Sequence, residues 1–277
     1  MAQPLSQKLL NNPGALCNML KRIAIEAGEI TLEYYDDSGY YGADEKGDGS
    51  PVTAADRAAE AHIVKAISGI LGDIPIIGEE LYSEGRAPEL NGADYFVLVD
   101  ALDGTKEFIA GGEEYTVNIA IIRNGAPFMG VVYLPVKGEL FSGYGPGTAL
   151  RWTDEAEKDR PIHVREQTSK GLVVVSSKSH GSASEMNEFL QDYKIAKVIK
   201  KGSSAKICAV ASGKADLYPR FGPTCEWDIA AGDAILRSAG GAIYDMDGQP
   251  MIYGKEAGKY LNPNFVAAIE GFWDFSD

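Results

Sequence analysis

The sequence predicts an α/β protein built from two layered subdomains, and three observations support this. Residues Tyr95–Val99 form an unbroken run of strand-forming side chains, typical of a strand buried on both faces. Strands and helices alternate in both halves of a 277-residue chain, which is long enough to bury a substantial core. The charged stretch 153–160 is the best boundary between the halves. We therefore expect an N-terminal subdomain over residues 1–155 and a C-terminal subdomain over residues 156–277.

Two helices precede the central strand. An apolar stripe at helical spacing predicts the first from Asn12-Pro13, which suit an N-cap and a first turn, to about Ser38-Gly39. A second stripe predicts a helix from Val52 to Leu71. The polar, glycine-rich stretch 42–51 between them suits an active-site flap or a simple connection, and both interpretations stay open.

The remaining N-terminal elements read as strands. Asn124-Gly125 between two alternating segments is a strong hairpin signal. The expected strands cover residues 74–77, 95–99, 116–123, 128–133, 139–144 and 148–152.

The C-terminal half again mixes strands and helices. Helices are expected over residues 184–193, from Gly202 through Ala211, and from Glu226 to Ala239. Strands are expected over residues 172–175, 195–199, 215–218, 242–244 and 264–269.

Composition narrows the function classes. The formal net charge is −14 and no basic cluster is present, which argues against a nucleic-acid polymer as partner. A small phosphorylated ligand remains compatible with an acidic protein when metal ions supply positive charge locally. The cysteines, Cys17, Cys208 and Cys225, are widely spaced and odd in number, so neither a disulfide framework nor a zinc site is predicted.

The N-terminus lacks a signal peptide, and no apolar run reaches the length of a membrane span. We expect a cytoplasmic protein without an integral membrane segment. Peripheral attachment at the inner membrane face and a homodimer are both left open.

The stretch Asp100–Thr105 is the strongest chemical signal. Asp100 ends the buried run, and Asp103, Gly104 and Thr105 follow closely. Carboxylates suit a hard cation such as Mg²⁺, and glycine permits close backbone approach to a ligand. Aspartates and glycines also make ordinary turns, so this stretch alone is about equally consistent with either. The separation of three residues between the aspartates argues against an aspartyl-phosphate enzyme.

The same pattern occurs one strand earlier. The strand 74–77 ends in Gly78, Glu79 and Glu80. Two neighbouring strands with such endings would bring Glu79, Asp100 and Asp103 together. Asp56 has a simpler interpretation, because Thr53 with Asp56 three residues later resembles a helix capping box.

Two helix starts in the C-terminal half are further candidates. Ser203, Ser204 and Lys206 suit either a phosphate site at a helix N-terminus or ordinary serine capping. Asp228 is favourable at a helix start in any protein because of the macrodipole.

Taken together, these motifs resemble the inositol monophosphatase superfamily of lithium-sensitive, magnesium-dependent phosphatases. The matching residues, in the family's order, are Thr53–Asp56, Gly78–Glu80, Asp100–Thr105 and Trp227-Asp228. The resemblance covers nearly the whole chain, and the combination of motifs is highly specific. It implies a layered α/β/α/β/α sandwich of the sugar-phosphatase type, with the active site between two α/β subdomains.

Within the superfamily, the chain most resembles the CysQ-type 3′(2′),5′-bisphosphate nucleotidases. The segments that carry this similarity are 46–53, 106–108, 177–180, 202–206 and 218–224. Three positions depart from the family's habit: Ala101 stands for proline, Cys225 for serine or asparagine, and Asp233 for histidine. Ala101 loosens the turn without moving the carboxylates, whereas Asp233 would alter the wall near Asp228.

The resemblance implies roles for individual residues. Metal ligands would be Glu79, Asp100, Asp103, Asp228 and the Leu102 carbonyl, holding two or three Mg²⁺ ions per site. Catalytic roles fall to Asp56 and Thr105, which would activate water, and to Glu79, which would help hold a third ion. The substrate would be contacted by Glu79, Leu102, Asp103, Gly104, Thr105, Asp228, His180, Ser203, Ser204, Lys206 and Arg220.

The implied reaction is hydrolysis of the 3′-phosphate of 3′-phosphoadenosine 5′-phosphate, giving AMP and phosphate. 3′-Phosphoadenylyl sulfate, which would give adenylyl sulfate, is a second substrate left open. The alternatives are an inositol monophosphatase or fructose-1,6-bisphosphatase of the same superfamily. A non-catalytic protein that binds a phosphorylated ligand is the alternative from a different class.

Overall fold

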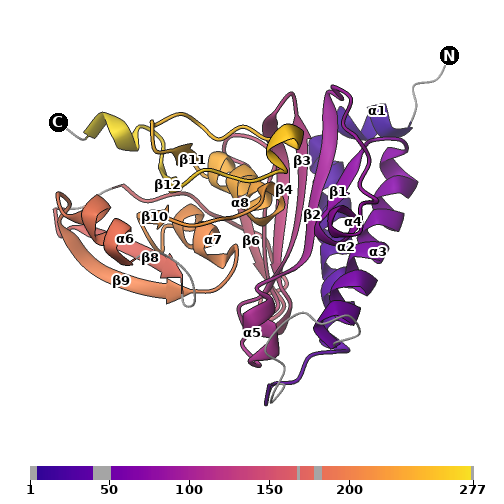
Figure 1. The fold of residues 1–277 in the computed structure, drawn as a ribbon, viewed down its shortest axis with the longest axis horizontal. Coiled ribbons are helices and arrows are strands. Elements are labelled where there is room, and N and C mark those ends of the chain that lie inside the picture. Colours follow the sequence, from indigo (N-terminus) through magenta and orange to yellow (C-terminus); the bar gives the residue numbers. More distant parts are fainter. Residues whose placement is uncertain (1–4, 40–50, 167–168, 178–182, 276–277) are drawn as a thin grey trace.

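The computed structural model describes residues 5–39, 51–166, 169–177 and 183–275. Two β-sheets and three helical layers stack in alternation (Figure 1), which confirms the predicted layered α/β class. The helices are α1 Leu5–Leu10, α2 Pro13–Leu32, α3 Pro51–Leu71, α4 Glu79–Ser83, α5 Thr105–Ile109, α6 Ala183–Leu190, α7 Ala205–Ala211 and α8 Glu226–Ser238, with 3₁₀ turns η1 Pro135–Lys137, η2 Glu256–Gly258 and η3 Phe272–Phe275.

The first sheet has seven strands in sequential order, β1 to β7. β1 and β2 are parallel, and the other neighbours are antiparallel. The strands are β1 Ile76–Gly78, β2 Tyr95–Asp103, β3 Thr116–Arg123, β4 Ala126–Leu134, β5 Glu139–Gly143, β6 Leu150–Thr153 and β7 Arg160–Pro161. Because β7 still belongs to this sheet, the sheet extends past residue 155, and the division into subdomains there stays a prediction.

The second sheet has five strands in the order β11-β12-β10-β8-β9. β8, β9 and β10 run parallel to one another, and β12 pairs antiparallel with both β10 and β11. The strands are β8 Leu172–Ser177, β9 Ile195–Lys201, β10 Leu217–Arg220, β11 Gly241–Asp245 and β12 Phe265–Ile269.

The central strand β2 is buried on both faces, as its sequence predicts. Val97 and Val99 face the helices α2 and α3, whereas Phe96 and Leu98 face the layer between the sheets. This alternation follows from the two-residue period of a strand.

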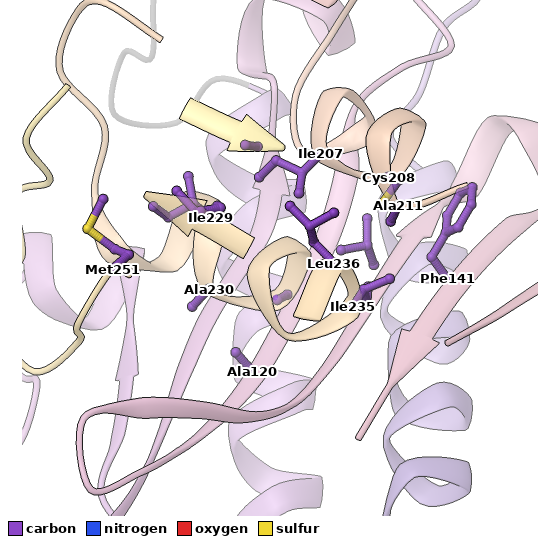
Figure 2. Packing of buried hydrophobic residues seen from close by; sticks show 14 of the residues in the cluster. Ala120, Phe141, Ile207, Cys208, Ala211, Ile229, Ala230, Ile235, Leu236 and Met251 are labelled. Atoms are coloured by element: carbon purple, nitrogen blue, oxygen red, sulfur yellow. The ribbon is translucent and has the colours of Figure 1, made fainter. Parts of the chain in front are cut away.

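The layer between the sheets consists of α7 and α8 (Figure 1), and its apolar side chains join both halves in one core. Figure 2 shows Ile207 on α7 and Ile235 and Leu236 on α8 packed near Ala120 and Phe141 of the first sheet. Burial of this apolar surface is the main force that holds the two sheets together. The outer face of the second sheet packs against Phe189 and Phe272.

Several boundaries differ from the sequence expectation. α2 ends at Leu32, before the expected Ser38-Gly39, and β2 continues through Asp103 instead of ending at Val99. α1 and the five-residue α4 were not expected. In the described part of the chain, every helix is too short or too polar to cross a membrane.

Candidate active site

A cavity of about 750 Å³ is lined by residues from both halves of the protein. Four acids line it, Glu79, Asp100, Asp103 and Asp228, here called the acidic floor. Ser203, Lys206 and Arg220 also line it and are here called the basic wall. The volume is within the usual range of small-molecule sites, which is about 300–1,000 Å³.

The parallel pair β1 and β2 places two of the acids side by side. Gly78 pairs with Val99 in the ladder, so Glu79 and Asp100 are the next residue on each strand. The expectation that two strand endings bring these acids together is confirmed. Oxygen atoms of Glu79, Asp100 and Asp228 all lie within 4.8 Å of one another.

The end of β2 is irregular between Asp100 and Asp103, where the ladder to β3 shifts register. The Leu102 N–H donates to Asp100 Oδ1 at 3.0 Å, which fixes the turn through the aspartate side chain. Ala101 is fully buried against α2 and α3, so no proline is needed to hold this turn. Gly104 follows at φ 100°, in the left-handed region that glycine favours, and α5 begins at Thr105.

Asp228 comes from the start of α8, far along the chain. Its carboxylate accepts the Cys225 N–H at 2.8 Å, and the Cys225 side chain caps the Asp228 N–H in return. Cys225 is therefore the N-cap residue of α8, at a position where serine or asparagine would be usual.

The acidic floor gathers several carboxyl groups in a buried place. Burial and the neighbouring carboxylates of Glu79 and Asp103 raise the pKa of Asp100 well above its ordinary value. Burial and Asp103 likewise raise the pKa of Asp228. Like charges gathered this closely are favourable when a cation lies among them, and carboxylate oxygens are the ligands that hard divalent cations prefer. These residues therefore fit a metal site.

Asp56 and Thr105 lie on adjacent elements. Asp56 is fully buried on α3, and an oxygen of its carboxylate lies within 4.8 Å of oxygens of Glu79 and Glu80. The neighbouring Ala55 packs with Leu102 and Phe108, which places this part of α3 against α5. The capping-box interpretation is wrong, because α3 begins at Pro51 and Thr53 lies inside the helix. The hydrogen bond between Asp56 and Thr105 stays a prediction.

Ser204 connects two acids of the floor. Its N–H donates to Asp103 Oδ2 at 2.7 Å. Its hydroxyl lies 2.7 Å from the Asp228 carbonyl oxygen and 3.1 Å from the same Asp103 oxygen. Ser204 is thus engaged with the floor from the opposite half of the protein, while its predicted contact with substrate stays a prediction.

The basic wall is dominated by a buried ammonium group. Lys206 is only 7% exposed, and burial lowers its pKa to about 8. Its Nζ donates to the Ser203 carbonyl at 2.6 Å and lies 5.4 Å from the centre of the Tyr218 ring. Arg220 donates to the Pro223 carbonyl at 3.2 Å. Both cations lie at the cavity surface, where they can receive an anionic group.

Some of the predicted positions cannot be compared with the structure, because His180 and residues 42–50 of the polar loop lie outside the described residues.

The expectation that Asp233 alters the wall near Asp228 is wrong. Asp233 is fully buried away from the cavity, pairs with Arg237, and accepts hydrogen bonds from the Tyr253 hydroxyl and the Ile243 N–H. Its role is to tie α8 to β11.

Sequence reasoning missed two acids that support the site. The Glu60 carboxylate accepts the N–H groups of Glu80 and Leu81 at 2.9 and 2.8 Å, which caps the short helix that carries Glu79. Its position four residues after Asp56 on one helix was an available signal. Glu114 accepts hydrogen bonds from Lys137 and Lys201, which lie 23 and 87 positions further along the chain. Nothing in the sequence near Glu114 indicates these contacts.

The sequence model of the inositol monophosphatase family matches residues 15–271. The 3′(2′),5′-bisphosphate nucleotidase CysQ of Escherichia coli K12 is 41% identical over 248 residues, covering 90% of this chain and 97% of that protein. CysQ from Bacteroides thetaiotaomicron has a similar structure, with a TM-score of 0.74 and 36% identity over 90% of this chain and 94% of that one. An inositol monophosphatase from Anabaena has a TM-score of 0.71 at 25% identity, over 93% and 91% of the two chains.

Proposed function

The chain belongs to the inositol monophosphatase family, and from this we propose that it is a 3′(2′),5′-bisphosphate nucleotidase. Its reaction is hydrolysis of 3′-phosphoadenosine 5′-phosphate to AMP and phosphate. The similarity to CysQ proteins over nine-tenths of the chain favours this substrate over inositol phosphates or fructose 1,6-bisphosphate.

One structural observation carries the proposal: a single cavity is lined by both the acidic floor and the basic wall. The metal-binding acids suit the phosphate that is cleaved. The lysine and arginine of the wall suit a second phosphate, because these side chains make strong charge-assisted hydrogen bonds to phosphate oxygens. A substrate with two phosphates on one nucleoside matches both groups.

The metal is proposed to be Mg²⁺, with two or three ions per site. The residues that would hold it are Glu79, Asp100, Asp103 and Asp228, with the Leu102 carbonyl. Bound Mg²⁺ would supply positive charge that neutralises the phosphate and acidifies a water molecule.

The protein's own residues then have distinct tasks. The Asp56 carboxylate and Thr105 hydroxyl orient the attacking water and accept its proton. The N–H groups of Gly104 and Thr105 donate to oxygens of the cleaved phosphate, and the N–H of a first helical residue has no partner inside its own helix. The water oxygen bonds to phosphorus as the bond from phosphorus to O3′ breaks. O3′ leaves as an alkoxide and takes a proton from a second, solvent water, and the hydroxide so formed is neutralised by the proton released from the attacking water.

Selectivity is assigned to the basic wall. Ser203, Lys206 and Arg220 would hold the 5′-phosphate. Since 3′-phosphoadenylyl sulfate carries the same 3′-phosphate, its hydrolysis to adenylyl sulfate by the same steps is part of the proposal. A cytoplasmic location and a homodimer stay predictions.

A side-by-side phosphate-release assay tests the proposal. The substrates are 3′-phosphoadenosine 5′-phosphate, inositol 1-phosphate and fructose 1,6-bisphosphate, each with EDTA and then with excess Mg²⁺. We expect the nucleotide to give the highest kcat/KM, with all turnover stopped by EDTA and restored by Mg²⁺. Preferred hydrolysis of either sugar phosphate would reject the assignment. Saturable nucleotide binding without metal-dependent turnover would instead indicate a binding protein.

A further inference from the structure

Glu114 lies just before β3 and is buried at 7% exposure, next to the turn that carries Ser204. We propose that Glu114 is a positioning residue that keeps Ser204 on Asp103 and thereby sets the affinity of the acidic floor for its cation. The inference rests on the proposed function only in treating Asp103 as a metal ligand.

Three contacts of Glu114 are made with one short segment of the opposite half. Its Oε1 accepts the Lys201 Nζ at 3.0 Å, and its Oε2 accepts the Gly202 N–H at 3.1 Å. Its backbone carbonyl accepts the Ser203 hydroxyl at 2.6 Å. Lys137, from the first half, donates to the same Oε1 at 2.8 Å. One residue beside the first sheet therefore holds the last residue of β9 and the two residues that follow it.

The held segment has a conformation that needs external support. Ser203 has φ 39°, in the left-handed region that residues other than glycine seldom adopt. At Gly202 two backbone segments of the chain approach so closely that an added Cβ would lie 2.9 Å from the Glu114 carbonyl oxygen. Glu114 provides this support directly, through hydrogen bonds on both sides of the unusual φ.

The next residue along the chain is Ser204, whose N–H donates to Asp103 Oδ2 at 2.7 Å. A hydrogen bond to one oxygen of a carboxylate fixes its rotamer and leaves the other oxygen aimed at the metal. If Glu114 no longer holds Gly202 and Ser203, the turn relaxes and the Ser204 N–H loses its direction. Asp103 then becomes a poorer ligand, although no ligand has been removed.

This role differs measurably from a merely structural one. Loss of stability alone would lower the amount of active protein at every Mg²⁺ concentration. Loss of positioning would raise the Mg²⁺ concentration needed, with kcat recovered when the metal is saturating. A matched control is available in Glu113, which carries the same charge next in sequence but is exposed.

The test compares Glu114→Gln with Glu113→Gln. Mg²⁺ binding is measured by calorimetry without substrate, and amide hydrogen exchange is followed in the peptide 201–206. For Glu114→Gln we expect a Kd for Mg²⁺ about tenfold higher, as outer-shell substitutions typically give, together with faster exchange at Ser204. Glu113→Gln should stay within about twofold of wild type in both measurements, as surface charge changes usually do. At saturating Mg²⁺, kcat of Glu114→Gln should return close to wild type.

An unchanged Mg²⁺ affinity in folded Glu114→Gln would overturn the inference, and so would a low kcat that saturating Mg²⁺ does not rescue. If this variant does not fold, Lys137→Met removes one partner of Glu114 without touching the turn. It should raise the Kd for Mg²⁺ about threefold, less than a direct substitution, and no change there would overturn the inference as well. Mg²⁺ binding is measured without nucleotide, so it does not depend on the substrate. If the wild-type protein fails to hydrolyse the nucleotide, the proposed function is rejected, but the comparison of Mg²⁺ affinity between Glu114→Gln and Glu113→Gln still tests the inference.

Discussion

The acidic floor and the basic wall face one cavity but are built in different ways. The floor acids lie near the ends of strands and helices: Glu79 opens α4 after β1, Asp103 ends β2 with Asp100 three residues before it, and Asp228 lies in the first turn of α8. The wall residues come from three elements: Ser203 lies in a turn, Lys206 in the first turn of α7 and Arg220 at the end of β10. Two of them contact each other, because Lys206 donates to the Ser203 carbonyl.

This difference in construction suggests that the acidic floor determines turnover and the basic wall determines which substrate is preferred. Strand and helix ends fix the carboxylates within a rigid frame, as a metal site with defined geometry requires. The wall includes the turn at Ser203 and borders the loop 221–224, and such segments are the usual places where related proteins differ in what they bind. We infer that changes in the floor affect turnover, whereas changes in the wall affect substrate preference.

The largest effect is expected from removing a charge in the floor. Asp103→Asn and Asp228→Asn should each lower kcat for the nucleotide by more than the roughly 100-fold that outer-shell changes reach, because a metal ligand itself is lost. Phosphate release at saturating Mg²⁺ measures this. Circular dichroism should show a folded protein in both cases. Activity like that of wild type in either variant would remove the metal role of the floor.

A smaller effect is expected from pH at the wall. Because burial lowers the pKa of Lys206 to about 8, its ammonium is present below that pH and is lost as the pH rises through it. The KM for 3′-phosphoadenosine 5′-phosphate should therefore rise above pH 8, by up to about tenfold for one lost charged hydrogen bond. Kinetics of wild type and Lys206→Met from pH 6.5 to about pH 9.5 check this. The rise should vanish in the variant, and an equal rise in both would assign it to another group.

The stability of the metal-free protein gives the next test. Replacing a floor acid should raise this stability, although the same replacement lowers activity. The pKa of Asp100 is raised above its ordinary 3.8 by burial and like charge. Its neutral form contributes stability that is complete below that ordinary value and is lost as the pH rises through the raised value. In EDTA at pH 7, Asp100→Asn should thus melt higher than wild type. A gain of about 1 kcal/mol corresponds to roughly 2–4 °C.

Melting curves at pH 4 and pH 7 supply the control, since the difference between the two proteins should shrink at the lower pH. Added Mg²⁺ should stabilise wild type more than the variant, because only a ligand that binds the folded state shifts its stability. A variant that melts below wild type in EDTA at pH 7 would mean that Asp100 has local partners strong enough to need no cation.

Part of the floor was predictable from hydrophobic patterns, because Glu79 and Asp100 each follow a buried apolar run, whereas Asp228 was placed with them only by the family resemblance. Glu79 and Asp100 were expected to meet on this ground, and they do. The layered fold followed from the same patterns. The path of β2 through Asp103 was not predictable, because the irregularity there depends on pairing with β3.

Among the supporting residues, Glu114 could not be predicted, since its partners are distant in sequence. Nothing around Glu114 indicates that it holds a turn nearly ninety positions later. Asp233 was interpreted as part of the site wall, although its partners Arg237, Tyr253 and Ile243 make it part of the core. A polar residue on a helix gives no local sign of which face of the helix it occupies in the packed protein.

The smallest effect is expected at Ala101, where the family's habit is proline. Because the Asp100 side chain already fixes the turn through the Leu102 N–H, Ala101→Pro should change kcat by less than about threefold and leave the KM for Mg²⁺ unchanged. Steady-state kinetics over a Mg²⁺ series measure both. A large loss of activity would show that the N–H of residue 101 is needed in β2.

The division between floor and wall is tested most directly by kcat/KM for 3′-phosphoadenosine 5′-phosphate and for 3′-AMP, which lacks the 5′-phosphate. Both substrates are measured at saturating Mg²⁺ with wild type and Lys206→Met. Wild type should prefer the bisphosphate by at least about tenfold, the worth of one charge-assisted hydrogen bond, and the variant should lose most of that preference through the bisphosphate alone. Equal losses on both substrates, or a wild type without preference, would contradict the assignment of the second phosphate to the basic wall.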